Sequence, residues 1–202
     1  MDEIQYRRLV GDDLKRHLDA LAELRIAVFR DFPYLYEGSL DYERRYLEIY
    51  GETIDALIVG AFDGDRLVGA ATGLPLAAEP PSLQMPLEQA GFSARTIFYF
   101  GESVLLKPYR GRGIGVRFFK ERETHATSLG RFTHMVFCGV VRPLDHPRRP
   151  AGYKPLDLFW QRRGFTKLEG AVGTMSWRDL DETAESEKPM QFWIKPVGDR
   201  SL

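Results

Sequence analysis

Apolar residues near the start of the chain recur every three or four positions, as on one face of an α-helix. They are Leu14, Leu18, Leu21, Leu24 and Val28. A short apolar run at residues 4–9 is typical of a strand before this helix, and Asp12 or Asp13 can cap its first turn. A second helix is expected after Ser39, where three tyrosines spaced four residues apart lie on one face. Such a stripe either belongs to the core or lines a cleft.

From residue 56 the pattern changes to short runs of small and β-branched residues, which are typical of strands. Residues 56–62 and 67–76 are joined by the turn sequence Asp-Gly-Asp at residues 63–65, which predicts a hairpin. A proline-containing excursion at residues 74–93 has room for one helical turn and could either cover a site or form a plain loop. A strong strand is expected next, at residues 97–106.

The second half of the chain alternates between strand and helix patterns. A helix that ends near Leu129 follows a glycine-rich turn, and then come a buried strand at residues 134–141 and a short helix at residues 156–163. Two further strands, at residues 173–177 and 190–194, flank an acidic loop and are expected to pair antiparallel. This order of elements predicts an α/β chain with a mixed sheet.

Composition and charge narrow the classes of function. We assign the whole chain (1–202) to a single domain, because it contains no repeat and no interdomain linker. The 28 Lys and Arg residues nearly balance the 29 Asp and Glu residues, so no excess charge points to nucleic acid or to an acidic membrane. No stretch approaches the roughly 18 apolar residues that cross a bilayer. The single cysteine, Cys138, gives no sign of an oxidising compartment. We therefore expect a cytoplasmic protein with neither a membrane nor a nucleic-acid partner.

A glycine-rich turn at residues 108–115 is the most informative part of the sequence. Three glycines at alternating positions follow a strand and open a helix, and such a turn presents free backbone N–H groups at the positive end of the helix dipole. Arg110 and Arg112 add positive charge, so the pattern favours the binding of a phosphate. The alternative is a tight turn that only packs the strand on the helix. The turn lacks the ending of a P-loop, and Val116 stands where a dinucleotide-binding fingerprint requires glycine.

At this turn the sequence resembles the GNAT superfamily of N-acetyltransferases. The family's acetyl-coenzyme A loop, Arg/Gln-x-x-Gly-x-Gly/Ala, is matched by Arg110, Gly113 and Gly115. Residues 104–108 resemble the family's fourth strand, and residues 159–165 resemble its Phe-Tyr-x-x-x-Gly-Phe signature. With the element order, the resemblance covers nearly the whole chain. It implies a GNAT-like α/β (α+β) fold, with a mixed, mostly antiparallel central sheet that is flanked by helices and splayed between its fourth and fifth strands.

The resemblance also implies a site for acetyl-coenzyme A (acetyl-CoA). Its residues would be Leu105, Leu106, Arg110, Gly111, Arg112, Gly113, Ile114 and Gly115. The amides of residues 111–115 would take the pyrophosphate, and the main chain near Leu106 would pair with pantetheine as an added strand. Only Tyr109 lies where the family commonly has two residues, so a tighter loop is expected. No metal site is expected, because the four histidines lie far apart and outside any cluster with ligand spacing.

Glu102 is the candidate catalytic base. On a regular strand it shares one face with Phe98, Phe100, Val104 and Leu106. A carboxylate in such an apolar row has a raised pKa, which suits the removal of a proton from an amine. The family often has an acidic residue at about this place. The alternatives are that Glu102 pairs with an arginine or accepts backbone donors at a bulge.

The identity of an acid for the departing thiolate is open. Trp160 occupies the position of a tyrosine that protonates this thiolate in many family members, and an indole cannot ionise usefully. Tyr153, where the family often has an asparagine that contacts the coenzyme, is the nearest alternative in sequence, although it could be an ordinary surface tyrosine. Cys138, in the middle of a strand, is expected to act as a small apolar residue.

The residues between the first two helices suggest an acceptor site. Asp31, Tyr34 and Tyr36 lie where the family usually builds its acceptor pocket, and aromatic rings with carboxylates would suit a cationic amine. The same residues could serve only in packing. The sequence therefore predicts an N-acetyltransferase that moves acetyl from acetyl-CoA to a primary amine of a small molecule by direct attack. The alternatives are a weakly catalytic coenzyme-binding module of the same fold and an enzyme that acetylates protein N-termini or lysines. Edge strands near the C-terminus make a homodimer reasonable.

Overall fold

The computed structural model describes residues 3–198, in which eight strands form one sheet. The strands are β1 (Gln5–Arg8), β2 (Leu57–Asp63), β3 (Arg66–Pro75), β4 (Ile97–Tyr99), β5 (Ser103–Leu105), β6 (His134–Val140), β7 (Thr166–Trp177) and β8 (Ser186–Pro196). They lie in the order β1-β2-β3-β4-β6-β8-β7, and β5 pairs with β3. Every pairing is antiparallel except the parallel pairing of β4 with β6. The mixed, mostly antiparallel sheet and the antiparallel ending of the chain are confirmed.

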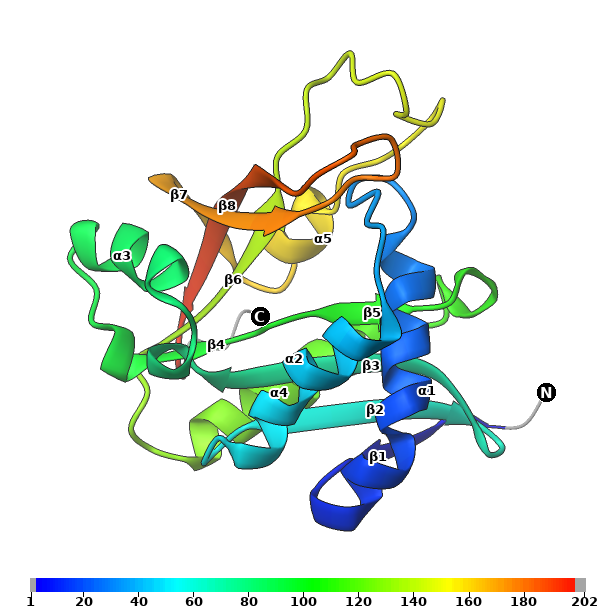
Figure 1. The fold of residues 1–202 in the computed structure, drawn as a ribbon. Coiled ribbons are helices and arrows are strands. Elements are labelled where there is room, and N and C mark those ends of the chain that lie inside the picture. Colours follow the sequence, from blue (N-terminus) through cyan, green and yellow to red (C-terminus); the bar gives the residue numbers. More distant parts are fainter. Residues whose placement is uncertain (1–2, 199–202) are drawn as a thin grey trace.

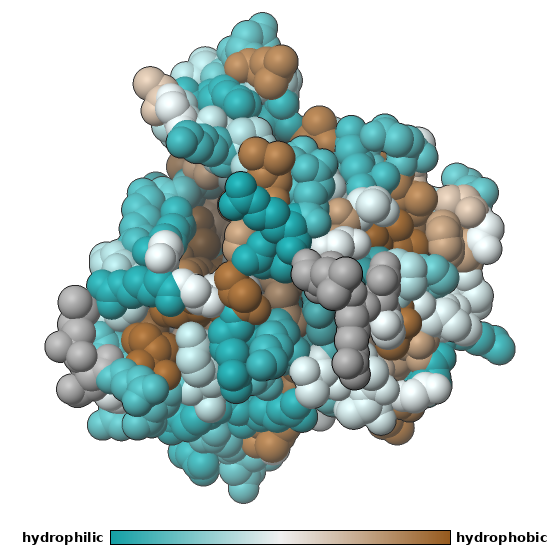
Figure 2. All heavy atoms as spheres, turned by 180° about the vertical axis from the view of Figure 1, so that it is seen from behind, coloured by the Kyte–Doolittle hydropathy of each residue, from teal (hydrophilic) through white to brown (hydrophobic). Residues whose placement is uncertain are grey.

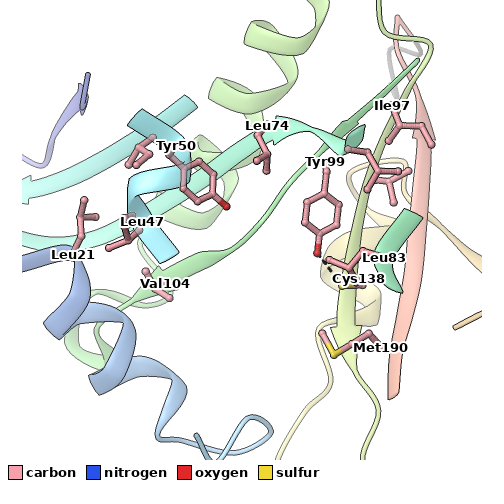
Figure 3. Close-up of a cluster of buried hydrophobic side chains, with 14 of the residues drawn as sticks. Leu21, Leu47, Tyr50, Leu74, Leu83, Ile97, Tyr99, Val104, Cys138 and Met190 are labelled. Carbon is pink, nitrogen blue, oxygen red and sulfur yellow. Dashed lines mark hydrogen bonds between the residues drawn. The ribbon is translucent and has the colours of Figure 1, made fainter. Parts of the chain in front are cut away.

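Helices cover both faces of this sheet (Figure 1). They are α1 (Gly11–Phe29), α2 (Leu40–Glu52), α3 (Pro81–Gln89), α4 (Ile114–Ser128) and α5 (Asp157–Gln161), with three 3₁₀ turns η1 (Leu76–Ala78), η2 (Ala94–Thr96) and η3 (Lys107–Tyr109). α1 and α2 lie on one face, where Leu21 and Leu47 share a buried cluster with Val104 of β5 (Figure 3). α4 lies on the other face, and α3 packs against β7. Among residues 3–198, no helix has the length and apolar character needed to span a membrane.

The beginnings of the first two helices differ in how they are capped. α1 starts at Gly11 without a side-chain cap, so the expected capping by Asp12 or Asp13 is wrong. Both carboxylates instead lie inside the first turn, where they stabilise the helix through its dipole. Ser39 caps α2 as expected, since its Oγ accepts a hydrogen bond from the Tyr42 N–H at 3.4 Å.

The expected continuous strand at residues 97–106 is wrong at its centre, where a bulge separates β4 from β5. Gly101 and Glu102 together oppose the single residue Thr72. The Gly101 N–H donates to the Thr72 carbonyl at 3.2 Å, and the Glu102 N–H donates to Thr72 Oγ1 at 3.1 Å. Two residues against one form a β-bulge, which re-aims the side chains that follow it. A Cβ at residue 101 would lie 2.6 Å from Thr72 Oγ1, so this close approach requires glycine.

The bulge decides which face of the sheet each neighbouring side chain occupies. Phe98 and Phe100 pack with Phe119 of α4. Val104 packs on the opposite face with α1 and α2, and Glu102 lines a cavity on that same side. The expectation that these residues share one face is therefore wrong, because one extra residue reverses the alternation of a strand.

Arg122 of α4 holds the bulge from the opposite face. Its side chain is 2% exposed, and its guanidinium donates to the carbonyls of Thr72 and Glu102 at 3.3 and 3.1 Å and to Ser103 Oγ at 2.7 Å. Burial lowers the pKa of Arg122 to about 9, so the side chain stays charged at neutral pH. A buried cation thus satisfies carbonyl oxygens at the point where the ladder is interrupted.

The sheet opens where the bulge ends. Within residues 3–198, β4 pairs with β6 from Ile97 to Tyr99, and the last hydrogen bond runs from the Phe100 N–H to the Val136 carbonyl at 2.8 Å. Beyond the bulge, β5 pairs with β3 alone among these residues. The two halves of the sheet therefore diverge between β5 and β6 (Figure 1). Because β4 and β5 together make up the expected fourth strand and β6 is the expected fifth, this is the splay that the resemblance implied.

Arg142 ties the connection between α1 and α2 to the far half of the sheet. Its guanidinium binds both carboxylate oxygens of Asp179 at 2.7 and 2.9 Å, and it donates to the carbonyls of Pro33 and Tyr34 at 2.7 and 2.8 Å. Such two-point pairs fix geometry as well as charge. The segment that carries Tyr34 is therefore anchored to the turn that follows β7.

Candidate active site

The turn before α4 presents a row of unused backbone N–H groups. The first hydrogen bond of α4 joins the Arg117 N–H to the Gly113 carbonyl at 3.0 Å. Within residues 3–198, the N–H groups of Gly111, Gly113, Ile114, Gly115 and Val116 have no hydrogen-bond acceptor. Gly111 and Gly113 have φ angles of 77° and 81°, in the left-handed region that favours glycine. A glycine turn that leads into a helix N-terminus in this way forms a cradle for a phosphate.

Arg110 and Asp31 link this turn to the end of α1. Arg110 Nε donates to the Leu105 carbonyl at 3.1 Å, and Arg110 Nη2 lies 3.8 Å from Asp31 Oδ2. Asp31 Oδ1 also accepts a hydrogen bond from Lys107 Nζ at 2.9 Å. These groups border an open hollow of about 390 Å³ between α1 and η3. Lys107 and Arg110 therefore hold the Asp31 carboxylate beside the glycine-rich turn, apart from Tyr34 and Tyr36.

On the edge of β5 that faces the splay, the Leu105 carbonyl accepts from Arg110, and the Leu105 N–H has no acceptor within residues 3–198. We had expected the main chain near Leu106 to pair with pantetheine. The Leu106 N–H instead donates to the Val68 carbonyl of β3 at 3.0 Å, so this amide is not available to pantetheine. Because neighbouring residues in a strand point their backbone groups to opposite sides, the N–H of Leu105 faces the splay. On the face that carries α4, the molecule is hollowed below the lobe at its top, and apolar atoms lie at the bottom of the hollow (Figure 2).

An aromatic cavity of about 90 Å³ lies where β4, β5 and β6 diverge. Its aromatic lining consists of Phe29, Tyr34, Tyr36, Tyr42, Tyr46, Tyr99 and Trp177. Tyr34 and Tyr36 are the predicted acceptor residues, and Tyr42 and Tyr46 belong to the tyrosine stripe of α2, which therefore lines a cleft. Burial raises the pKa of Tyr34 and of Tyr46, so both phenols stay neutral. The electron-rich faces of such rings attract a cation.

Arg25 of α1 joins two buried carboxylates beside this cavity. Its guanidinium pairs with Glu43 of α2 through Nε and with Glu102 through Nη1. The second oxygen of Glu102 accepts a hydrogen bond from the Tyr46 hydroxyl at 3.2 Å. The arginine pairing is the alternative that the sequence left open for Glu102, whereas its role as a base stays a prediction.

Glu79 is a second carboxylate in the cavity, and sequence reasoning missed it. The residue is 8% exposed and follows η1 in the proline-containing excursion. Burial, together with the negative charge of Glu102, raises the pKa of Glu79 to about 7. The signal in the sequence was a lone acid between Ala78 and Pro80, three residues after the expected strand at residues 67–76. Within residues 3–198 no cluster of three His, Cys, Asp or Glu side chains could hold a metal ion.

Tyr99 and Cys138 form a buried pair across β4 and β6 (Figure 3). The Tyr99 hydroxyl lies 3.0 Å from Cys138 Sγ, and both side chains border the aromatic cavity. Burial raises the pKa of the Cys138 thiol to about 12. Since the thiolate is the nucleophilic form, this cysteine is unsuited to attack a thioester.

We predict that Cys138 is inert in the folded protein. Native protein treated with 5,5′-dithiobis(2-nitrobenzoate) at pH 8 should release less than about one tenth of an equivalent of thiol in ten minutes, because only the thiolate reacts. The same protein in 6 M guanidinium should release one full equivalent. Rapid labelling of the native protein would contradict the buried, protonated thiol.

Tyr153 and Trp160, the two residues considered for the acid role, both lie outside the cavity lining. The Tyr153 ring packs against Phe32 with 4.7 Å between ring centroids. Trp160 packs against Phe137 and Trp193, with centroid distances of 5.0 and 5.1 Å. The acid role of Tyr153 stays a prediction for which the cavity geometry offers no support.

Comparison with solved structures identifies the fold. The chain is similar to the acetyltransferase of GNAT family from Streptococcus pneumoniae, with a TM-score of 0.57, 13% identity and coverage of 97% of this chain and 100% of that chain. It is similar to yncA from Salmonella typhimurium, solved with its cofactor acetyl-CoA, with a TM-score of 0.60, 12% identity and coverage of 100% and 98%. An aminoglycoside 6′-N-acetyltransferase complexed with coenzyme A gives a TM-score of 0.58, 16% identity and full coverage of both chains, 100% and 100%. Comparison of the sequence with protein-family models and with curated proteins finds no match. The chain has the fold of GNAT-family acetyltransferases.

Proposed function

We propose that this protein transfers an acetyl group from acetyl-CoA to the primary amine of a small molecule. The observation that carries the proposal is that β5 connects the phosphate cradle with the aromatic cavity. The free edge of β5 runs from the phosphate cradle before α4 to the bulge at which the aromatic cavity opens. One end suits a diphosphate, and the other end suits an ammonium group. The likeness in fold to acetyltransferases solved with coenzyme A or acetyl-CoA supports the same assignment.

The residues of the cradle and of β5 fit the coenzyme. The N–H groups of Gly111, Gly113, Ile114, Gly115 and Val116 would bind the pyrophosphate, and the guanidinium of the exposed Arg112 would add positive charge beside them. The edge of β5 at Leu105 would take the pantetheine amides in the manner of an added strand. When bound, the coenzyme supplies an acetyl group that is activated as a thioester.

The chemistry of the cavity favours direct attack by the amine. A covalent intermediate would need a nucleophile, and the single thiol of the sequence, Cys138, is held in its protonated form by burial. The chain instead supplies carboxylates and aromatic rings that can orient an ammonium group. We therefore assign to the cavity the binding of the acceptor and the removal of its proton.

The dimensions of the cavity favour a compact acceptor with a single charge. Its volume of about 90 Å³ is small beside the roughly 300–1,000 Å³ of pockets for drug-sized ligands. Seven aromatic side chains line it, and they suit one ammonium group on a short apolar body. A polycationic oligosaccharide would leave charges without partners in this lining.

Coenzyme binding and acetyl transfer can be measured separately. Acetyl-CoA should raise the Tm of the protein, because a ligand that binds only the folded state stabilises it. Release of free thiol from acetyl-CoA should then be followed with 2-phenylethylamine, tyramine and kanamycin as probe amines. We expect acetylation of the first two and not of kanamycin. A raised Tm without thiol release from any probe would favour a coenzyme-binding module instead.

A further inference from the structure

The carboxylate of Glu79 is the feature that the proposed acetyl transfer does not yet explain. Two carboxylates line the aromatic cavity, and they differ in their partners. Glu102 is bound by Arg25 and by the Tyr46 hydroxyl. Glu79 has no hydrogen bond or ion pair to its carboxylate within residues 3–198. A buried carboxylate without a partner in the chain has its lone pairs free for a proton of a bound molecule.

Hydrogen bonds fix the backbone on both sides of the Glu79 side chain. The Glu79 N–H donates to the Leu76 carbonyl at 2.9 Å, which closes the η1 turn. The Glu79 carbonyl accepts a hydrogen bond from the Gln84 side chain of α3, and two prolines follow at positions 80 and 81. The carboxylate therefore stands on a short turn that is locked on both sides. Such preorganisation is typical of groups that must meet a reacting atom.

The charges around Glu79 come from five elements, and they leave the site with a surplus of negative charge. The groups that face it are Arg25 of α1, Tyr46 and Tyr50 of α2, Tyr99 of β4, Glu102 of the bulge and Cys138 of β6. The tyrosines and the cysteine are neutral, because burial raises their pKa values. Arg25 offsets only one of the two carboxylates that it binds. A proton on Glu79 at neutral pH, or a bound ammonium group beside it, would relieve this surplus.

We propose that Glu79, and not Glu102, accepts the proton of the acceptor amine, a role that rests on the proposed acetyl transfer. An ammonium group in the cavity passes one N–H proton to the Glu79 carboxylate, and the freed nitrogen lone pair attacks the thioester carbonyl carbon. The C–N bond forms, and the C–S bond then breaks with its electron pair moving to sulfur. The second nitrogen proton passes to the departing thiolate, which leaves as free thiol. The Glu79 carboxyl finally returns its proton to water.

Kinetics with 2-phenylethylamine and tyramine test the role at the level of the reaction. In the wild type, kcat/KM should rise with pH through about 7, since only the ionised carboxylate can accept a proton and the pKa of Glu79 is about 7. Glu79→Gln should lower kcat about 30-fold or more at pH 7.5 and remove this limb of the pH profile, while the affinity for acetyl-CoA by calorimetry stays unchanged. Glu88→Gln, an exposed acid on α3, is the matched control and should keep the wild-type profile.

The stability of the protein tests the ionisation of Glu79 without any substrate. The folded-state pKa lies above the ordinary value of 4.5, so folding favours the protonated carboxyl. The stability of the wild type relative to Glu79→Gln should therefore be greatest below pH 4.5, fall between pH 4.5 and 7, and stay level above pH 7. We expect the Tm of Glu79→Gln to exceed that of the wild type by several degrees more at pH 8.5 than at pH 5. Glu88→Gln should show no such dependence.

The outcomes separate the two proposals. If the wild type acetylates a probe amine and Glu79→Gln keeps its rate and pH profile, the role of Glu79 is wrong and the acetyl transfer stands. If acetyl-CoA raises the Tm but the wild type acetylates neither probe, the amine acetyltransferase and with it the role of Glu79 are overturned. A Tm difference between wild type and Glu79→Gln that does not change from pH 5 to pH 8.5 would exclude the shifted carboxyl. Loss of the low-pH limb in Glu102→Gln alone would assign the proton to Glu102 instead.

Discussion

Replacing Arg25 with leucine is expected to lower the free energy of unfolding by about 3–5 kcal/mol, as for other buried ion pairs that lose one partner. The side chains of Arg25, Glu43 and Glu102 are 9%, 0% and 7% exposed. Without the guanidinium, two carboxylates on different elements would stay buried side by side with no cation. Denaturant unfolding at pH 7.5 measures the loss.

Two further variants show whether the buried charge is the cause. Arg44→Leu removes an arginine of α2 whose ion pair with Asp19 lies at the surface, and its unfolding should not differ measurably from that of the wild type. Adding Glu43→Gln and Glu102→Gln to Arg25→Leu should recover most of the lost stability, because the charges that need a partner are then gone. An Arg25→Leu protein as stable as Arg44→Leu would show that the three charged groups are not coupled as the structure indicates.

The two carboxylates of the cavity differ in their partners, because Arg25 pairs with Glu102 and, within residues 3–198, not with Glu79. One arginine pairs with both Glu102 and Glu43 and so holds these two carboxylates in place. Glu79 has no such partner within residues 3–198, and burial together with the charge of Glu102 raises its pKa to about 7. A carboxylate whose pKa lies near the working pH is suited to the role of a general base.

The order of elements and the glycine-rich turn could be predicted because they depend on local patterns. Helical spacing, the cap at Ser39 and the hairpin at residues 63–65 are set by neighbours in the sequence. α3 was underestimated as a single turn, although it spans nine residues. Pro81 sits in its first turn, where a missing N–H costs little, and the burial of Leu83 and Leu87 offsets Pro86. Burial against β7 was not visible in the sequence.

The parts of the site that sequence reasoning missed depend on contacts between distant segments. A bulge adds one residue to a strand, and the only local sign of it was Gly101, which Thr72 of another strand makes necessary. Asp31 was assigned to the acceptor pocket by its place between two helices, but Lys107 holds it beside the glycine-rich turn. The pKa of Glu79 is raised by burial and by the charge of Glu102, 23 positions away in the chain. Such pairings are fixed only by the fold.

Gly113→Val is expected to weaken acetyl-CoA binding about 100-fold, which corresponds to about 2.7 kcal/mol. Gly113 has a φ of 81°, a conformation that a β-branched residue adopts only with strain. The turn would therefore relax and carry the N–H groups of residues 113 and 114 away from the pyrophosphate. Each hydrogen bond to a charged group contributes about 1.5–3 kcal/mol, so the loss of one or two accounts for the effect. Isothermal titration calorimetry measures it.

The control for Gly113→Val lies at the other end of the same helix. Gly130 has a φ of 66° and, like Gly113, has no atom within 4 Å of its missing Cβ, so valine there causes the same kind of backbone strain. Gly130→Val should lower the Tm to a similar extent and leave the affinity for acetyl-CoA unchanged, because no phosphate is expected near the end of α4. Equal loss of affinity in both variants would mean that helix stability and not the N–H row governs binding. Full affinity in Gly113→Val would remove the cradle from the site and, with it, the assignment of the coenzyme.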